Sequence, residues 1–244
     1  MYEDAPTRES LEQLIHDLQL NQDSLELSIE ELPPVDWLAE NRKSFPPLEL
    51  GSFYIYGSHH ENQPLPTNKI CLHIDAATAF GTGQHATTQG CLALLEKLPK
   101  QAFTTGLDVG CGTGILAMAG ARLLQIPFVA LDIDDDAVQM ADENIKRNAL
   151  EKNVQVILSD GVSNACVLKH APYSLIFANI LAEPLIHLAK SIVEKASVNG
   201  FIILSGLMTH QEQDVLEAYL KEGCKKLDDY IQGDWCSLLL KRID

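Results

Sequence analysis

Apolar and polar residues follow two different rhythms along this chain, and the change falls near residue 85. In the front part, "ESLEQLIHDLQL" has its leucines and isoleucine at helical spacing, and "LELSIE" alternates as a strand does. Prolines then interrupt the pattern, and "GSFYIYG" predicts an isolated strand. We therefore expect a small α/β appendage over residues 1–35 and a linker over 36–70, with the main domain spanning 71–244.

After residue 85, short apolar runs alternate with amphipathic segments. The apolar runs predict strands at 105–110, 127–134, 154–160, 173–180 and 200–206, and the segments between and around them predict helices at 86–98, 114–125, 135–150, 183–196 and 209–223. Nearly continuous apolar strands separated by helices indicate a parallel sheet that is covered on both faces. Two strand-like runs around Gly233-Asp234 predict a C-terminal antiparallel hairpin. The expected fold is a doubly wound, Rossmann-like α/β sheet, whose ligand lies beyond the carboxyl ends of the strands.

The run "LDVGCGTGIL" carries the most informative turn. Gly110 and Gly112 lack a Cβ, so a ligand can approach the backbone N–H groups where the next helix begins. The dinucleotide fingerprint G-x-G-x-x-G requires a third glycine at the position of Ile115, so an NAD-dependent oxidoreductase is disfavoured. A G-x-G-x-G turn after an acidic strand residue, here Asp108, is typical of doubly wound S-adenosylmethionine-dependent methyltransferases, although glycine-rich turns occur in many α/β folds.

Polar side chains end the strands that follow this turn. Asp132 can accept hydrogen bonds from both ribose hydroxyls, whereas Asp134 or Asp135 suits the cap of the next helix. Asp160 can accept from an adenine amino group, with a solvated loop carboxylate as the alternative. Asn179 offers an uncharged amide to orient an incoming amine, with a helix cap as the alternative. Because these positions fall at neighbouring strand ends of one sheet, together they favour a methyltransferase.

Composition and charge disfavour several kinds of binding partner and site. The 34 acidic and 18 basic residues give a net charge of −16, which disfavours direct binding to nucleic acid or to an anionic membrane. The six cysteines form no Cys-x-x-Cys pair, so neither a zinc site nor a disulfide framework is expected. The chain shows no signal peptide and no apolar run long enough to span a membrane, and we expect a cytoplasmic protein.

Five stretches together resemble the bacterial ribosomal-protein methyltransferase family PrmA, which methylates the eleventh protein of the large ribosomal subunit. They are "AFGTGQHATTQGCL", "LDVGCGTGILAMAGARL", "DIDDDAVQMADENIKRNAL", "FANILAEPL" and "LSGLMTHQEQDVLEAY", within a resemblance that runs over about residues 36–240. The Phe-Gly-Thr-Gly-x-His run followed by two threonines is the most specific of these, because general methyltransferases lack it.

The resemblance implies roles for particular residues. Thr88, Gly110, Asp132 and Asn179 match the family's residues that bind S-adenosylmethionine, and Phe80 matches a position over the methionine end of the cofactor. The implied class I methyltransferase transfers methyl groups to lysine ε-amines and to the N-terminal α-amine of a basic ribosomal protein. His85 reads as a loop or capping residue without a catalytic role, and no residue is an obvious general base.

One feature departs from the family pattern. Members carry an N-terminal domain that recognises the ribosomal protein, and the residues before the matching linker are fewer here than such a domain needs. We therefore expect a shortened recognition domain, a misplaced start of the chain, or a different acceptor. The alternatives are a methyltransferase with the same cofactor site acting on another protein or small-molecule amine, and a scaffold that binds the cofactor without catalysis.

Overall fold

The structure, a computed structural model, describes residues 15, 17, 46–75, 85–99 and 103–243. The chain divides into two compact units, residues 1–37 and 38–244. The helix and strand expected in the front appendage lie almost entirely outside the described residues, and so do Phe80 and the first part of the "AFGTGQHATTQGCL" stretch. Within residues 38–244, the described segments form a three-stranded and a seven-stranded sheet.

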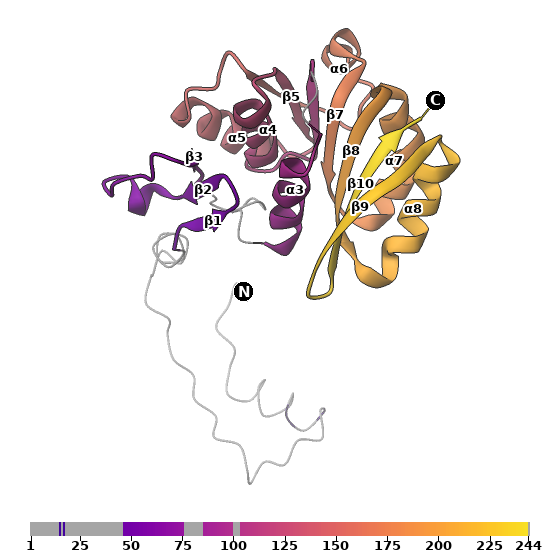
Figure 1. The fold of residues 1–244 in the computed structure, drawn as a ribbon, viewed down its shortest axis with the longest axis horizontal. Helices are drawn as coiled ribbons and strands as arrows, with labels where there is room; N and C mark the ends of the chain where they lie inside the picture. The colour runs from indigo at the N-terminus through magenta and orange to yellow at the C-terminus, as the bar shows by residue number, and fades with distance from the viewer. Residues whose placement is uncertain (1–14, 16, 18–45, 76–84, 100–102, 244) are drawn as a thin grey trace. The chain divides into compact units, whose positions relative to one another are not determined.

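The seven-stranded sheet has the order β6-β5-β4-β7-β8-β10-β9 (Figure 1). Its strands are β4 (Gly106–Val109), β5 (Phe128–Asp132), β6 (Val154–Leu158), β7 (Tyr173–Asn179), β8 (Ala196–Met208), β9 (Cys224–Gln232) and β10 (Trp235–Arg242). The first five strands in this order run parallel, and β10 and β9 join them as an antiparallel hairpin. The doubly wound sheet and the C-terminal hairpin predicted from the sequence are confirmed.

Helices cover both faces of this sheet (Figure 1). They are α3 (Ala86–Glu96), α4 (Ile115–Leu124), α5 (Asp135–Arg147), α6 (Ala165–His170), α7 (Ala182–Lys195) and α8 (Glu212–Lys221), with short 3-10 turns η2 (Ser58–His60) and η3 (Thr209–Gln211). One core joins α3, α4 and α5 to their face of the sheet, and a second core joins α6, α7 and α8 to the other face. Strand β7 is apolar because both of its faces are buried. Phe177 belongs to the first core and Ile176, on the opposite face, to the second.

The strand predicted to be isolated is not isolated. "FYIY" forms β2 (Phe53–Tyr56), which pairs antiparallel with β1 (Leu48–Leu50) and parallel with β3 (Ile70–His73). The sequence did not predict either partner, β1 with three residues or β3 with four. Phe53 and Leu72 are fully buried and belong to the core shared with α3 and α4, so this small sheet packs on the larger domain.

The remaining differences are small. Helix α6 has six residues and was not predicted, since an amphipathic repeat needs a longer stretch to be visible. His59 and His60 lie in η2, where His59 is exposed and His60 is half-buried. In the part of the chain that the structure describes, no helix is both long and apolar enough to cross a membrane. All six cysteines are free thiols.

Candidate active site at the strand ends

The sheet reverses its winding between β4 and β7, which is where a doubly wound fold binds its ligand. Val109 of β4 pairs with Leu131 of β5 on one side and with Ala178 of β7 on the other. The residues that follow these three are Gly110, Asp132 and Asn179, so the register brings the predicted positions to one edge. This convergence follows from strand pairing and not from any single motif.

The glycine turn between β4 and α4 has the backbone that only glycine adopts at low cost. Gly110, Gly112 and Gly114 have φ values of 70°, 52° and 79°, all in the left-handed region. The N–H groups of Gly110 and Cys111 both donate to the carbonyl of Leu131, at 2.9 Å each. The turn is therefore fastened to the end of β5 before helix α4 begins.

Asp132 connects this turn to the start of α5. Its Oδ2 accepts from the N–H of Gly112 at 2.8 Å, and its Oδ1 accepts from the N–H of Asp134 at 3.1 Å. Each carboxylate oxygen has a second lone pair, so both can accept a further hydrogen bond from a vicinal diol. The cap of α5 is Asp134, whose side chain accepts from the N–H of Asp136 at 3.0 Å. The predicted capping carboxylate is therefore Asp134, and the ribose role of Asp132 stays a prediction.

Asp108 is a buried carboxyl beneath the turn. It is 0% exposed, its Oδ2 accepts from the N–H of Ala117 at 2.9 Å, and its Oδ1 has no hydrogen-bond partner among the described residues. Burial, and then the neighbouring charge of Asp132, raise the pKa of Asp108 to about 7, against the hydrogen bond from Ala117. Burial likewise raises the pKa of the Cys111 thiol in the turn, so this cysteine stays protonated at neutral pH and is no nucleophile.

The start of α3 is tied to the same edge. Ser205 of β8 pairs with Asn179, and the Ser205 hydroxyl bonds to the carbonyl of Thr87 at 3.1 Å and to the Ser237 hydroxyl at 2.6 Å. His85 caps α3 through its Nδ1, which lies 2.8 Å from the Thr87 hydroxyl, and its ring meets Trp235 edge to face at 4.9 Å. The capping interpretation of His85 is confirmed. Sequence reasoning missed Ser205, although it directly follows an apolar run, Phe201–Leu204, just as Asn179 does in β7.

Ile180 is wedged between two glycines after Asn179. A Cβ on Gly110 would come within 2.3 Å of Ile180 Cγ2, and a Cβ on Gly206 within 2.2 Å of the Ile180 carbonyl oxygen. Gly206 also has a φ of 87°. Gly110, directly after β4, and Gly206, within β8, therefore both lie against Ile180, and a Cβ at either position would meet the residue that follows Asn179.

Two predicted residues lie at the margin of this arrangement. Thr88 is in the first turn of α3 and is 1% exposed, so it faces the interior beside the strand ends. Asp160 follows β6, the outer strand of the sheet, and is exposed. A cavity of 460 Å³ lies at the opposite edge, near the amino ends of β4, β5 and β6, and therefore away from these residues.

The residues fit an adenosyl cofactor. Left-handed glycines leave three positions of the turn without a Cβ atom, Asp132 retains acceptors for a ribose, and its negative charge favours a cationic sulfonium and ammonium group. Thr88, Gly110, Gly112, Asp132, Asp160 and Asn179 remain the predicted cofactor-binding set. Of these, the structure brings Gly110, Gly112, Asp132 and Asn179 together at one edge.

Comparisons with known proteins agree with this geometry. The family model described as "Ribosomal protein L11 methyltransferase (PrmA)" matches residues 1–243. A ribosomal protein L11 methyltransferase from Chelativorans sp. (strain BNC1) is 38% identical over 218 residues, covering 89% of this chain and 75% of that protein. One from Caulobacter sp. (strain K31) is 42% identical over 214 residues, covering 87% and 73%. The crystal structure of a ribosomal protein L11 methylase from Lactobacillus delbrueckii subsp. bulgaricus superposes with a TM-score of 0.71 at 26% identity, covering 82% of this chain and all of that one.

The doubly wound sheet, its glycine turn and the Asp132 carboxylate at the same edge are those of a Rossmann-like methyltransferase, and the protein is an enzyme of the protein methyltransferase class. More narrowly, the chain belongs to the ribosomal protein L11 methyltransferase family.

Proposed function

We propose that this enzyme transfers methyl groups from S-adenosylmethionine to ribosomal protein L11, at lysine ε-amines and at the N-terminal α-amine. The observation that carries the proposal is the meeting of the glycine turn with Asp132, where Gly112 donates to a carboxylate that keeps acceptors for a ribose. Membership of the family supports the acceptor, since the relatives are named for methylation of that protein.

The bound cofactor supplies an activated methyl group on a sulfonium, so this chain mainly binds, orients and excludes water. Asp132 holds the ribose, and the glycine turn holds the methionine end. Asn179 orients the acceptor amine with its uncharged side chain. With the cofactor bound, a neutral acceptor amine would form a bond to the methyl carbon as the carbon–sulfur bond breaks, which would leave adenosylhomocysteine and a methylated ammonium.

The acceptor amine must lose a proton before it can attack the methyl group. Lysine has an ordinary pKa of about 10.4, so a neutral amine must form before attack. Asp108 is fully buried, which keeps it from touching an acceptor, and the site residues identified at the strand ends include no strong base. We therefore assign proton loss to water, aided by the nearby sulfonium charge and by desolvation of the amine.

The deciding experiment is mass spectrometry of purified ribosomal protein L11 after incubation with the enzyme and S-adenosylmethionine. The expected result is mass gained in steps of one methyl group, located at lysines and the N-terminus. A full-length family member is the positive control. If the control methylates L11 and this chain does not, the acceptor assignment is wrong.

Calorimetry tests the cofactor separately from the acceptor. We expect saturable binding of S-adenosylhomocysteine and none of NAD. Saturable NAD binding without binding of adenosylhomocysteine would overturn the cofactor assignment. Binding of adenosylhomocysteine together with an unmodified L11 would favour the alternative, a methyltransferase with this cofactor site and a different amine acceptor.

A further inference from the structure

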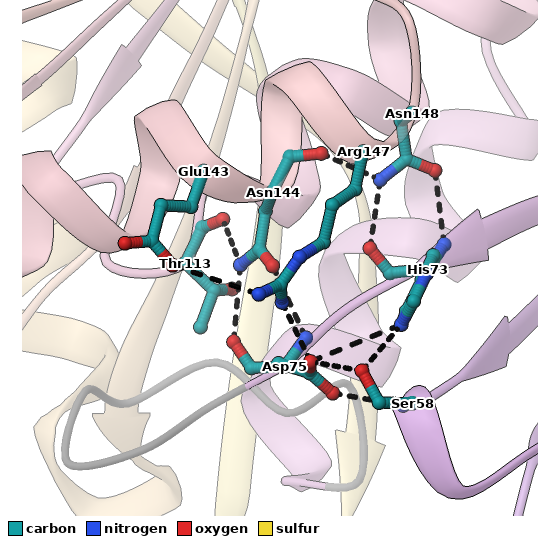
Figure 2. Close-up of polar contacts among 8 residues, drawn as sticks. All are labelled: Ser58, His73, Asp75, Thr113, Glu143, Asn144, Arg147 and Asn148. Carbon is teal, nitrogen blue, oxygen red and sulfur yellow. Dashed lines mark hydrogen bonds and ion pairs between the residues drawn. The ribbon is translucent and has the colours of Figure 1, made fainter. Parts of the chain in front are cut away.

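Two asparagines of α5 hold the edge of the small sheet in the way that a neighbouring strand would (Figure 2). The amide of Asn148 accepts from the N–H of His73 at 2.9 Å and donates to the His73 carbonyl at 2.7 Å. One turn earlier, Asn144 accepts from the N–H of Asp75 at 3.1 Å and donates to the Asp75 carbonyl at 3.1 Å. We call these contacts of Asn144 and Asn148 the asparagine ladder.

Matching repeats make the ladder possible. Residues four apart in a helix are separated by about 6.0 Å along its axis, and residues two apart in a strand by about 6.6 Å. Alternate strand residues also point their N–H and C=O groups to the same side. Each asparagine therefore pairs with the backbone of one residue, His73 at the end of β3 or Asp75 two residues later, although helix and strand are about 70 positions apart in the chain.

Each asparagine makes one more hydrogen bond, and the two bonds differ in destination. Nδ2 of Asn148 donates to the Asn144 carbonyl at 2.8 Å, within α5 itself. Nδ2 of Asn144 donates to the carbonyl of Thr113 at 3.1 Å, which is inside the glycine turn. Asn144 is 1% exposed, so both of its N–H groups and its oxygen are committed to backbone partners.

We propose that Asn144 is a positioning residue for the cofactor, because its side chain fixes the glycine turn and the chain at Asp75 relative to each other. It does so through Thr113, and it lies outside the set of residues assigned to the ligand. This inference rests on the proposed function, since the ligand whose binding it governs is the adenosyl cofactor.

Charged contacts strengthen the same junction (Figure 2). The Asp75 carboxylate is held by Arg147 of α5 at 2.6 Å and by the N–H of Ser58 at 2.9 Å, while the Ser58 hydroxyl bonds to the same carboxylate. The His73 ring stacks on Tyr56, with centroids 5.0 Å apart, and its Nε2 lies 3.0 Å from the Ser58 hydroxyl. The ion pair between Arg147 and Asp75 still joins the small sheet to α5 when either asparagine is replaced, so we expect both variants to fold and to be comparable.

The experiment compares Asn144→Ala with Asn148→Ala in the full chain. Each variant loses three hydrogen bonds, two of them to the backbone of His73 or Asp75, and only Asn144→Ala loses the bond to the turn. We expect the Kd for S-adenosylhomocysteine, measured by calorimetry, to rise about tenfold or more for Asn144→Ala and less than about threefold for Asn148→Ala, within the usual range of coupling between sites. Equal effects on Kd would show that Asn144 acts only through general stability.

A second pair covers the case in which an alanine variant does not fold. Asn144→Asp keeps the acceptor for the N–H of Asp75 but loses the donors, and Asn148→Asp makes the same change facing His73. The expected order of Kd values is the same. If the wild-type chain does not bind adenosylhomocysteine, the proposed function fails and this inference with it; if it binds and both Asn144 variants bind as tightly, only this inference fails.

Hydrogen exchange gives a readout that does not depend on comparing affinities. Coupling is reciprocal, so a ligand that fixes the turn must also strengthen the contact between Asn144 and the N–H of Asp75. We expect adenosylhomocysteine to slow exchange at the Asp75 amide of the wild-type chain, and this slowing to disappear in Asn144→Asp but persist in Asn148→Asp. An unchanged exchange rate at Asp75 in the liganded wild-type chain would overturn the proposal.

Discussion

At the scale of single residues, two neighbouring aspartates have separate roles. Asp132→Ala removes the carboxylate that faces the glycine turn, and Asp134→Ala removes only the cap of α5. We expect Asp132→Ala to weaken adenosylhomocysteine binding about tenfold to a hundredfold, the usual effect of losing hydrogen bonds to a charged group. Asp134→Ala should cost about 1 kcal/mol of stability and leave the Kd unchanged. Calorimetry and urea unfolding of both variants test this prediction. If Asp132→Ala binds adenosylhomocysteine as tightly as the wild type does, Asp132 has no ribose role.

Gly206 offers a second comparison at this scale. Gly206→Ala brings a Cβ against the Ile180 backbone, which must move and displace Asn179, whereas Gly233→Ala meets nothing within 4 Å. Both positions have left-handed backbone, with φ of 87° and 60°, so both variants carry a conformational cost of about 1 kcal/mol. We expect methyl transfer to fall at least about tenfold in kcat for Gly206→Ala, since a small misplacement of a positioning group is costly. Unchanged kcat in both variants would show that Asn179 tolerates the displacement or takes no part.

At the scale of elements, the start of α3 depends on one hydroxyl from β8. Ser205→Ala removes the contacts to the Thr87 carbonyl and to Ser237, which should cost about 1–3 kcal/mol and loosen the helix turn that contains Thr88. Ser174→Ala is the matched control, because Ser174 is also buried and bonds to the backbone of Thr104 and Thr105, but at the amino end of β7. We expect both to lower the urea midpoint and only Ser205→Ala to raise the Kd for adenosylhomocysteine. If Ser174→Ala raises the Kd as much as Ser205→Ala does, the weaker binding comes from general destabilisation of the sheet and not from the start of α3.

The sequence predicts the elements of the large sheet well because their signals are local. The apolar run of β7 and the repeat of α7 each exceed the length at which periodicity becomes visible, and Gly110 and Asp132 stand at ends that such runs define. The contacts that the sequence does not predict are those between segments far apart in the chain. The partners of β2, the ladder of Asn144 and the wedge of Ile180 each join residues whose own neighbours carry no signal of the contact.

At the scale of the whole molecule, the net charge of −16 makes the stability of the chain depend on pH through many groups at once. The contribution of a single carboxyl to this pH dependence is obtained by subtracting the stability of a variant from that of the wild type, because all other titrating groups contribute equally to both. Asp75 and Asp108 provide two such comparisons with opposite signs. Burial alone would raise the pKa of Asp75, but hydrogen bonds from Ser58 and the charges of Arg147 and His73 outweigh it and lower this pKa.

For Asp108 the folded state holds its proton more tightly than the unfolded state does. The unfolded carboxyl titrates near pH 3.9, whereas burial raises the folded pKa to about 7. Between these values the folded state binds one more proton, so the wild type loses stability as pH rises, by up to about 1.4 kcal/mol per pH unit. Asp108→Asn does not titrate and keeps an oxygen for the N–H of Ala117. We therefore expect its stability relative to wild type to increase from pH 4 to pH 7 and then level off.

Urea midpoints of the wild type, Asp108→Asn and Asp75→Asn at intervals from pH 4 to 8 provide the measurement. Asp75→Asn is the control of opposite sign. The stability that ionised Asp75 contributes is complete above the ordinary aspartate pKa of about 3.9 and is lost only as pH falls through its lowered pKa, so its difference from wild type should be flat over this range. Parallel curves for wild type and Asp108→Asn would mean that Asp108 is ionised in the folded protein. The carboxyl beneath the glycine turn would then add a full negative charge next to the site proposed for a cationic cofactor.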